Sequence, residues 1–267
     1  MKRFGRFLAT AMICVLAVGV GVFAGCSQQG SSNQPDYADT AFIQSLAKGY
    51  EARSVVVKQN EKADKTVEYY EKLVDSELDQ VEKYQSSKFE DSKLQENAIA
   101  YINALKDQRA AAEKYASDND AFKQEWQKAY DKRTTLLKTF VEDYGMTVSS
   151  AYQEDLDKLI SHGKKVENEN NEKAAVEALA NSIQVEFVEK YLVIYGQATV
   201  ANNTGYSFDN INFEVELFDA NGVKVETSHM YATHWLAGET VVLDCYTSQK
   251  EVPASFKVVT SYYKVSE

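Results

Sequence analysis

The segment AVEALANSIQVEFVEKYLVIY, residues 175–195, marks a change of secondary structure along this chain. Up to Ser182 its apolar residues recur every three or four positions, which is the spacing of a helix. From Val185 onward apolar residues alternate with their neighbours, which is the period of a strand. The segment therefore predicts a helical part before residue 183 and a β part after it.

Residues 39–182 have the pattern of an antiparallel helical bundle. No proline occurs between Asp39 and Asn181, and glycine occurs there only at Gly49, Gly145 and Gly163. Several apolar stripes recur at helical spacing and cover one face each. The longest stripe holds Phe122, Trp126, Tyr130, Arg133, Leu137, Phe140 and Tyr144. The stripes predict four or five helices.

The breaks between the stripes carry typical signals for helix ends. Ser-x-x-Gln patterns that begin at Ser92 and Ser150 match capping boxes. Gly145 follows the longest stripe, where a left-handed residue would end a helix. The acidic, asparagine-rich residues 167–172 suggest a solvated linker between two shorter helices.

The β part contains short alternating runs separated by turn residues at 202–205, 219–222 and 237–239. Six or seven antiparallel strands in residues 183–267 indicate a β-sandwich of immunoglobulin-like type. The expected fold class is α+β, with an N-terminal antiparallel helical bundle followed by an immunoglobulin-like antiparallel β-sandwich.

Three motifs of the β part, residues 196–205, 213–222 and 236–240, resemble the FxLYD domain of bacterial surface lipoproteins. The pentapeptide that names this domain falls on residues 215–219, with Val215 in place of its Phe and Phe218 in place of its Tyr. The similarity covers about residues 184–266. It implies an immunoglobulin-like domain on a cell-envelope protein and brings no catalytic residues.

The N-terminus has the pattern of a secretory signal peptide. Lys2, Arg3 and Arg6 precede an apolar run over residues 7–23. The run is just short of a comfortable bilayer span, so a plain transmembrane anchor is the alternative.

The end of that run, Phe23-Ala24-Gly25-Cys26, resembles a bacterial lipoprotein box. The resemblance implies that residues 1–25 are removed and that the Cys26 thiol carries a diacylglycerol. The polar residues 26–38 would then form a flexible tether. We expect a lipid-anchored protein on the extracytoplasmic face of the cell membrane.

The charge of the chain argues against nucleic acid as a partner. The formal net charge is -11, and removal of residues 1–25 takes away three basic and no acidic residues, which leaves about -14. Such a surface repels phosphate backbones.

Cysteine usage excludes an internal disulfide in the mature chain. Cys14 would leave with the signal and Cys26 would be lipidated, so Cys245 is left alone. Alternation in its strand favours a buried structural thiol over a reactive one.

Motifs for metal binding and catalysis are missing from the sequence. His162, His229 and His234 have no spacing typical of zinc ligands. The acidic residues 118–120 fit a helix start better than a calcium loop. No P-loop, G-x-S-x-G or dinucleotide motif occurs. We therefore expect no enzyme, no metal and no cofactor.

Aromatic residues are the remaining functional signal, with 17 tyrosines in the chain. Most tyrosines of the β part follow the alternation of their strands. Tyr206, His234 and Trp235 lie beside turns and are the candidate partner-binding residues. The alternative for Trp235 is a packing role in the core.

The expected function is a noncatalytic, membrane-anchored interaction or adaptor module at the cell envelope. Its partner would be another protein or an envelope polymer. The alternative is a lipoprotein that binds a small ligand between the bundle and the sandwich, since domain interfaces favour pockets.

Overall fold

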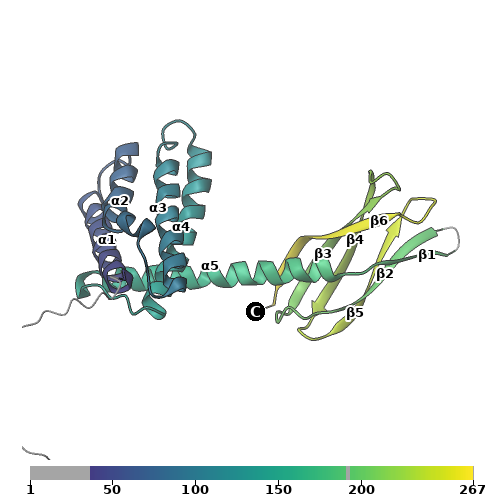
Figure 1. The fold of residues 1–267 in the computed structure, drawn as a ribbon. Helices are drawn as coiled ribbons and strands as arrows, with labels where there is room; N and C mark the ends of the chain where they lie inside the picture. The colour runs from purple at the N-terminus through teal and green to yellow at the C-terminus, as the bar shows by residue number, and fades with distance from the viewer. Residues whose placement is uncertain (1–36, 191–192, 267) are drawn as a thin grey trace, which may run out of the picture. The chain divides into compact units, whose positions relative to one another are not determined.

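The structure, a computed structural model, describes residues 37–190 and 193–266. The signal segment, Cys26 and the tether up to residue 36 lie outside the described residues. Within these residues, helices occupy the first part of the chain and strands the second (Figure 1). The chain is a mixed α+β protein, as the sequence predicts.

The helices of the described part are α1 (Asp39–Gln59), α2 (Val67–Val81), the short 3-10 helix η1 (Glu82–Ser86), α3 (Ser92–Ala112), α4 (Asn119–Glu142) and α5 (Ser150–Ser182). Its strands are β1 (Glu186–Lys190), β2 (Val193–Ala201), β3 (Phe208–Phe218), β4 (Lys224–Trp235), β5 (Thr240–Thr247) and β6 (Ser255–Val265). We call residues 39–182 the helical region and residues 183–266 the β region.

Two helix starts differ from the predicted capping boxes. The cap of α3 is Asp91, one residue before Ser92, and its carboxylate accepts the first free backbone N–H groups. Ser149 precedes α5 without a side-chain hydrogen bond, so the box expected at Ser150 is also wrong. The left-handed residue expected after α4 is confirmed, because Gly145 has a φ of 66°.

Helices α1 to α4 stand side by side in Figure 1, and each packs against the next along the chain. Their inward faces share one hydrophobic core. Its largest fully buried apolar side chains include Phe42, Leu46, Tyr101, Ile102, Leu105, Leu137 and Phe140. The Phe42 and Phe140 rings meet edge to face, with 5.4 Å between centroids, so this core ties α1 directly to α4.

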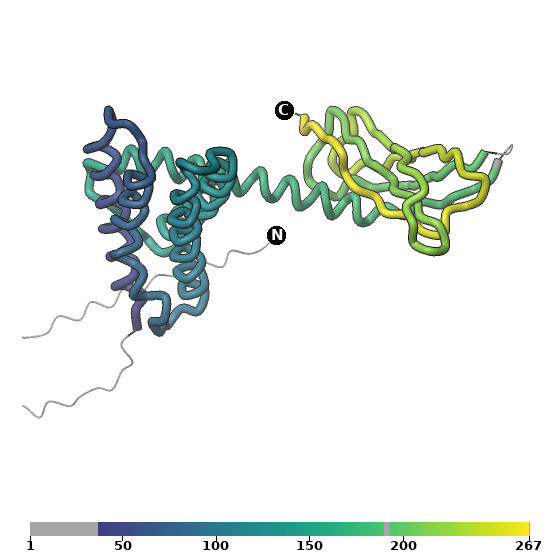
Figure 2. Tube along the Cα trace, turned by 90° about the horizontal axis from the view of Figure 1, so that it is seen from above, coloured from purple at the N-terminus to yellow at the C-terminus, as the bar shows by residue number. Residues whose placement is uncertain are grey.

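Helix α5 is one uninterrupted helix of 33 residues, which Figure 2 follows as a single coil. The linker predicted at residues 167–172 is therefore wrong, although the segment is solvated as expected. The segment has no glycine or proline to break the helix. Lys138 of α4 also holds it, with Nζ 2.6 Å from the Glu167 carboxylate.

A close backbone approach brings α5 onto α4. Gly163 is buried, and a Cβ at this position would lie 2.6 Å from the backbone oxygen of Thr134. That distance is shorter than any normal contact, so only glycine allows this crossing. The absence of a side chain at Gly163 therefore positions the first half of α5.

The strands form two antiparallel three-stranded sheets, in the orders β1-β2-β5 and β4-β3-β6. The alternating run 185–195 belongs to two strands, because Lys190 of β1 pairs with Val193 of β2. Both sheets contribute to one hydrophobic core. Its members from the strands include Ala198, Leu243 and Cys245 of the first sheet and Phe213, Val215, Leu217 and Met230 of the second.

The last turns of α5 belong to the same core as the strands. Val176, Leu179, Ala180 and Ile183 are buried against residues of both sheets. The predicted boundary between residues 182 and 183 passes through this shared core. Helix α5 therefore supplies apolar surface to the helical region with its first half and to the β region with its second.

We predict that a fragment of residues 170–267 is markedly more stable than a fragment of residues 184–267. The shorter fragment lacks four core residues, and loss of each large apolar side chain costs about 2 to 5 kcal/mol. Thermal melting followed by circular dichroism of both fragments tests this. Equal melting temperatures would show that α5 adds nothing to the β core.

Candidate functional site

Trp235 lies in the core, at the end of the β region where β3 begins and β4 ends. It is 0% exposed, and its ring packs on Phe208 with 6.4 Å between centroids. Its indole Nε1 donates a hydrogen bond to the backbone oxygen of Glu239 over 3.1 Å. Burial supports the packing role for Trp235, and the indole offers no surface to a partner.

His234 is exposed and has a φ of 51°, the one positive value outside glycine in residues 37–190 and 193–266. Ala232 is buried, so simple alternation along β4 would turn His234 inward. The left-handed backbone at His234 interrupts the alternation of inward and outward side chains along β4. As a result, Trp235 points inward in place of His234 and pairs with Phe208 of β3. The backbone of His234 thus directs Trp235 into the core, while its ring stays exposed.

Tyr206 is half-buried against the β core, and the loop that carries it is held by Asn202. Asn202 is 0% exposed. Its Nδ2 donates to the backbone oxygens of Tyr206 at 2.8 Å and Leu236 at 3.1 Å, and its Oδ1 accepts from the Thr204 hydroxyl at 2.7 Å. This one side chain joins the loop before β3 to the turn after β4.

Two strongly exposed tyrosines lie on the outer face of the β4-β3-β6 sheet. Tyr231 of β4 is 70% exposed and Tyr262 of β6 is 52% exposed. Both pair with exposed Asn212 of β3, so the three side chains form one row across the sheet. We call Tyr231, Asn212 and Tyr262 the tyrosine row.

The β1-β2-β5 sheet also exposes a tyrosine. Tyr246 of β5 is 69% exposed, and its ring lies 6.5 Å from that of Tyr195 on β2. The alternation of the sequence predicts ordinary sheet packing for these strand tyrosines, and it leaves the turn residues Tyr206, His234 and Trp235 as the candidate binding residues. The sequence does contain a signal for the exposure of Tyr231. This residue lies between the apolar residues Met230 and Ala232, which are both buried, so alternation along β4 turns Tyr231 to the opposite, outer face.

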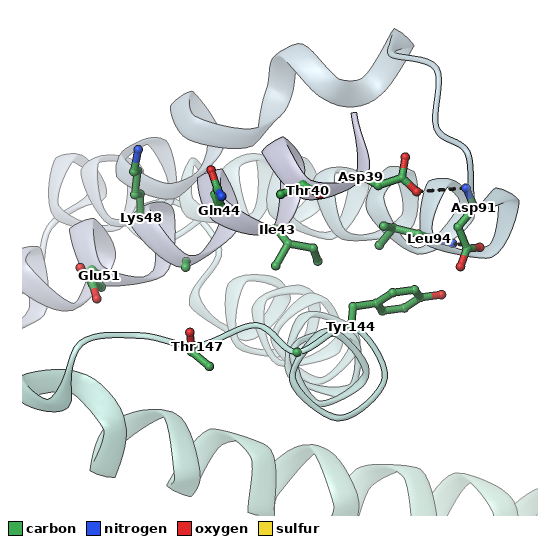
Figure 3. Close-up of a pocket in the computed structure, with 12 residues that line it drawn as sticks. Asp39, Thr40, Ile43, Gln44, Lys48, Glu51, Asp91, Leu94, Tyr144 and Thr147 are labelled. Atoms are coloured by element: carbon green, nitrogen blue, oxygen red, sulfur yellow. Dashed lines mark hydrogen bonds between the residues drawn. The ribbon is translucent and has the colours of Figure 1, made fainter. Parts of the chain in front are cut away.

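A cavity of about 620 Å³ lies between α1, the start of α3 and the loop after α4, and is shown in Figure 3. Two of its carboxylates accept hydrogen bonds from backbone N–H groups. Asp39 accepts hydrogen bonds from the backbone N–H groups of Glu90 and Asp91, at 2.8 and 3.0 Å. Glu51 accepts one from Ser149 N at 2.7 Å. Asp39 and Glu51 are thus already engaged by backbone N–H groups just before α3 and α5.

A second cavity, of about 380 Å³, lies among α1, α2, α4 and α5. Aromatic side chains form much of its wall and two arginines contribute to its lining. Its principal residues are Tyr50, Arg53, Tyr70, Trp126, Tyr130 and Arg133. We call it the arginine cavity.

The two arginines meet at Glu77 of α2, which is 0% exposed. Arg133 of α4 binds the carboxylate with two hydrogen bonds of 2.8 Å, and Arg53 of α1 donates a third over 3.2 Å. The Tyr101 hydroxyl of α3 donates a fourth. Four helices therefore contribute to one buried charge cluster.

The ionisation of this cluster follows from burial and from the neighbouring charges. Burial alone would raise the pKa of Glu77, but Arg133 and Arg53 hold it below its ordinary value. Burial and the like charge of Arg133 lower the pKa of Arg53 to about 10. Burial raises the pKa of Tyr101 well above its ordinary value. Glu77, Arg53 and Arg133 are therefore charged at neutral pH, and Tyr101 is neutral.

Cys245 and His162 have structural surroundings. Cys245 is 1% exposed, and burial raises the pKa of its thiol, which suits a core residue better than a nucleophile. His162 Nε2 lies 2.9 Å from an Asp131 carboxylate oxygen on the neighbouring helix α4. Asp118 caps α4 by accepting from Ala121 N, which confirms the helix start predicted there.

Within residues 37–190 and 193–266, no three His, Cys, Asp or Glu side chains gather as ligands for a metal ion. No helix in the same residues has the length and apolar character to cross a bilayer. Neither a known protein family nor a curated protein matches the chain.

We predict that Asn202→Asp destabilises the protein. The change removes an amide donor shared by buried carbonyl oxygens and sets a carboxylate against them, at a cost of about 1 to 3 kcal/mol or more. The matched control is Asn203→Asp, one residue further along the chain and exposed. Thermal melting should show a loss for Asn202→Asp alone, and equal melting temperatures would contradict the role given to Asn202.

We predict that Glu77→Gln destabilises the protein by about 3 to 5 kcal/mol, because it leaves two buried arginines without a counter-charge. This corresponds to a fall in melting temperature of roughly 6 to 20 °C. The control is Glu96→Gln on α3, whose exposed pair with Lys93 contributes little. Similar melting temperatures for the two variants would show that the cluster adds no stability.

The acid dependence of stability provides a second test of the cluster. The folded-state pKa of Glu77 is lowered, so its contribution is complete above the ordinary glutamate pKa of about 4.3 and is lost as the pH falls through the folded value. Urea unfolding between neutral and acidic pH should therefore show a smaller acid loss for Glu77→Gln than for Glu96→Gln. An identical acid loss would contradict the lowered pKa.

Proposed function

We propose that this protein is a noncatalytic lipoprotein, anchored to the extracytoplasmic face of the cell membrane through a diacylglycerol on Cys26. The support is the order of basic residues, apolar run and Phe23-Ala24-Gly25-Cys26 at the N-terminus. Two acyl chains are enough for stable anchoring, where one is marginal. The polar residues 26–36 would serve as the tether; the predicted tether ends earlier than residue 38, because Ala38 is buried in the helical core and its backbone N–H donates to the Lys88 oxygen.

We also propose that the β region is an immunoglobulin-like sandwich of the FxLYD type. Two antiparallel sheets that share one core are the architecture expected of such a domain. Two of the three motifs that carry the resemblance, at residues 196–205 and 236–240, are joined by Asn202, whose side chain donates to the Leu236 oxygen and whose backbone N–H donates to the Glu239 oxygen. The two motifs therefore share a structural role, because together they hold one end of the β region, and this supports the assignment.

The proposed activity is binding of an envelope polymer by the tyrosine row, and exposure of these side chains is the observation that carries it. Tyrosines that are 70% and 52% exposed offer flat apolar faces and hydroxyl groups to a partner. Sugar rings match this chemistry, since their C–H faces pack on aromatic rings while Asn212 can hydrogen-bond to hydroxyls. A neutral glycan also avoids repulsion from the acidic protein.

A small ligand held between the helical region and the β region has weaker support. The cavity between α5 and the end of β2 has a volume of about 240 Å³. Ligand pockets usually measure about 300 to 1,000 Å³. We therefore favour partner binding by the sheet surface over the ligand site expected at this junction.

We predict that Cys26→Ser releases the protein from membranes or stops its processing, because serine cannot form the thioether to the lipid. Cell fractionation with immunoblotting measures both effects. A serine variant of mature length that still sediments fully with membranes would rule out lipid anchoring at Cys26.

We predict that the double variant Tyr231→Ala, Tyr262→Ala binds isolated cell-envelope glycan at least about tenfold more weakly than the parent protein, as expected for hot-spot aromatics. Tyr246→Ala is the matched control, since Tyr246 is 69% exposed on the other sheet. Cosedimentation with purified glycan measures binding. Equal loss in the control, or none in the double variant, would contradict the assignment to the tyrosine row.

A further inference from the structure

The floor of the arginine cavity carries an excess positive charge. Arg53 and Arg133 face a single carboxylate, Glu77, so the buried cluster has a formal charge of +1. Within the described residues, the hydrogen bonds of both guanidinium groups run to Glu77 alone. Arg53 is 7% exposed and Arg133 is 1% exposed, and both line the cavity. A buried charge without a counter-charge is costly, so one further anion would be stabilised here.

The wall above this floor is aromatic. Tyr70 and Trp126 lie 4.9 Å apart between centroids, and the Arg53 guanidinium carbon lies 5.9 Å from the Trp126 centroid. Tyr50 and Tyr130 complete the lining on α1 and α4. Flat apolar rings and a polar base together favour a ligand with an aromatic body and one polar end.

The rim of the cavity adds no net charge. Lys58 Nζ lies 3.7 Å from the Asp155 carboxylate, and these two residues offset each other. With the rim included, the arginine cavity keeps its formal charge of +1. A monoanion would neutralise it, whereas a dianion such as phosphate would leave excess negative charge near Glu77 and Asp155.

We propose that the arginine cavity binds a small organic monocarboxylate with an aromatic body. The carboxylate accepts charge-assisted hydrogen bonds from Arg53 and Arg133, and the body packs between Tyr50, Trp126 and Tyr130. The volume of about 380 Å³ suits a ligand of that size. The site lies within the helical region and is independent of the partner surface proposed for the β region.

The ionisation of Arg53 agrees with this assignment. Burial and the neighbouring charge of Arg133 lower the pKa of Arg53 to about 10, so the protein itself holds this charge at a cost. A bound carboxylate would remove part of that cost. Arg133 already has two hydrogen bonds to Glu77, which leaves Arg53 as the main ligand contact.

Calorimetric titration of the full-length protein with sodium phenylacetate tests the proposal, with 2-phenylacetamide and inorganic phosphate as comparison probes. Phenylacetate should bind in a saturable way, and the neutral amide about tenfold or more weakly, since hydrogen bonds to charged groups contribute about 1.5 to 3 kcal/mol. Phosphate should bind more weakly than phenylacetate. The absence of saturable phenylacetate binding, or equal affinity for amide or phosphate, overturns the proposal.

Two variants locate the site. Arg53→Met should weaken phenylacetate binding about tenfold or more, while Arg109→Met removes the same charge from α3 outside the cavity and should leave affinity unchanged. Val57→Phe narrows the mouth at a residue that is 45% exposed and should also weaken binding. Melting temperatures confirm that each variant is folded. Full affinity in both Arg53→Met and Val57→Phe would place any binding elsewhere.

Tryptophan fluorescence supplies an independent readout. Trp126 lines the arginine cavity and Trp235 lies in the core of the β region. Phenylacetate should change the emission of the parent protein and leave that of Trp126→Phe unchanged. A response that persists in Trp126→Phe would show that the ligand contacts another part of the chain.

Discussion

The helical region depends on one buried carboxylate. Glu77 of α2 receives hydrogen bonds from α1, α3 and α4, through Arg53, Tyr101 and Arg133. In a low-dielectric interior these partners must meet at short distances, because any of the charges left alone is heavily penalised. The cluster therefore restricts how the four helices can slide or rotate, which a core of interchangeable apolar side chains does less strictly.

A single polar side chain has a comparable role in the β region. Asn202 joins two loops that are far apart in sequence, and the turn after β4 in turn accepts the indole N–H of Trp235. The left-handed residue His234 completes this arrangement by directing Trp235 inward. The turns at residues 202–205 and 236–239, which carry two of the sequence motifs, thus use their polar groups and Trp235 in hydrogen bonds within the domain. The exposed aromatic side chains Tyr231, Tyr246 and Tyr262 lie instead on the strand faces.

Periodicity was sufficient to predict the order of helices and strands, since each burial pattern depends on residues close in sequence. It did not predict that α5 continues through residues 167–172, because anchoring at both ends of that segment is a tertiary effect. The predicted stripe includes Arg133, but its partner Glu77 lies 56 residues away and has no feature in the sequence that separates it from a surface glutamate. Alternation places the strand tyrosines on sheet faces, but it does not predict which of these faces stay exposed, because that depends on how the sheets pack.

The contact of Gly163 with Thr134 has a consequence for how the sequence can vary. At this crossing even a methyl group meets backbone, whereas residues 168–171 of the same helix are exposed. Further on, Val176 and Leu179 are again enclosed, this time by the sheets. Substitutions along α5 should therefore be tolerated poorly near Gly163 and near Val176 and Leu179, and well at the exposed residues 168–171 between them.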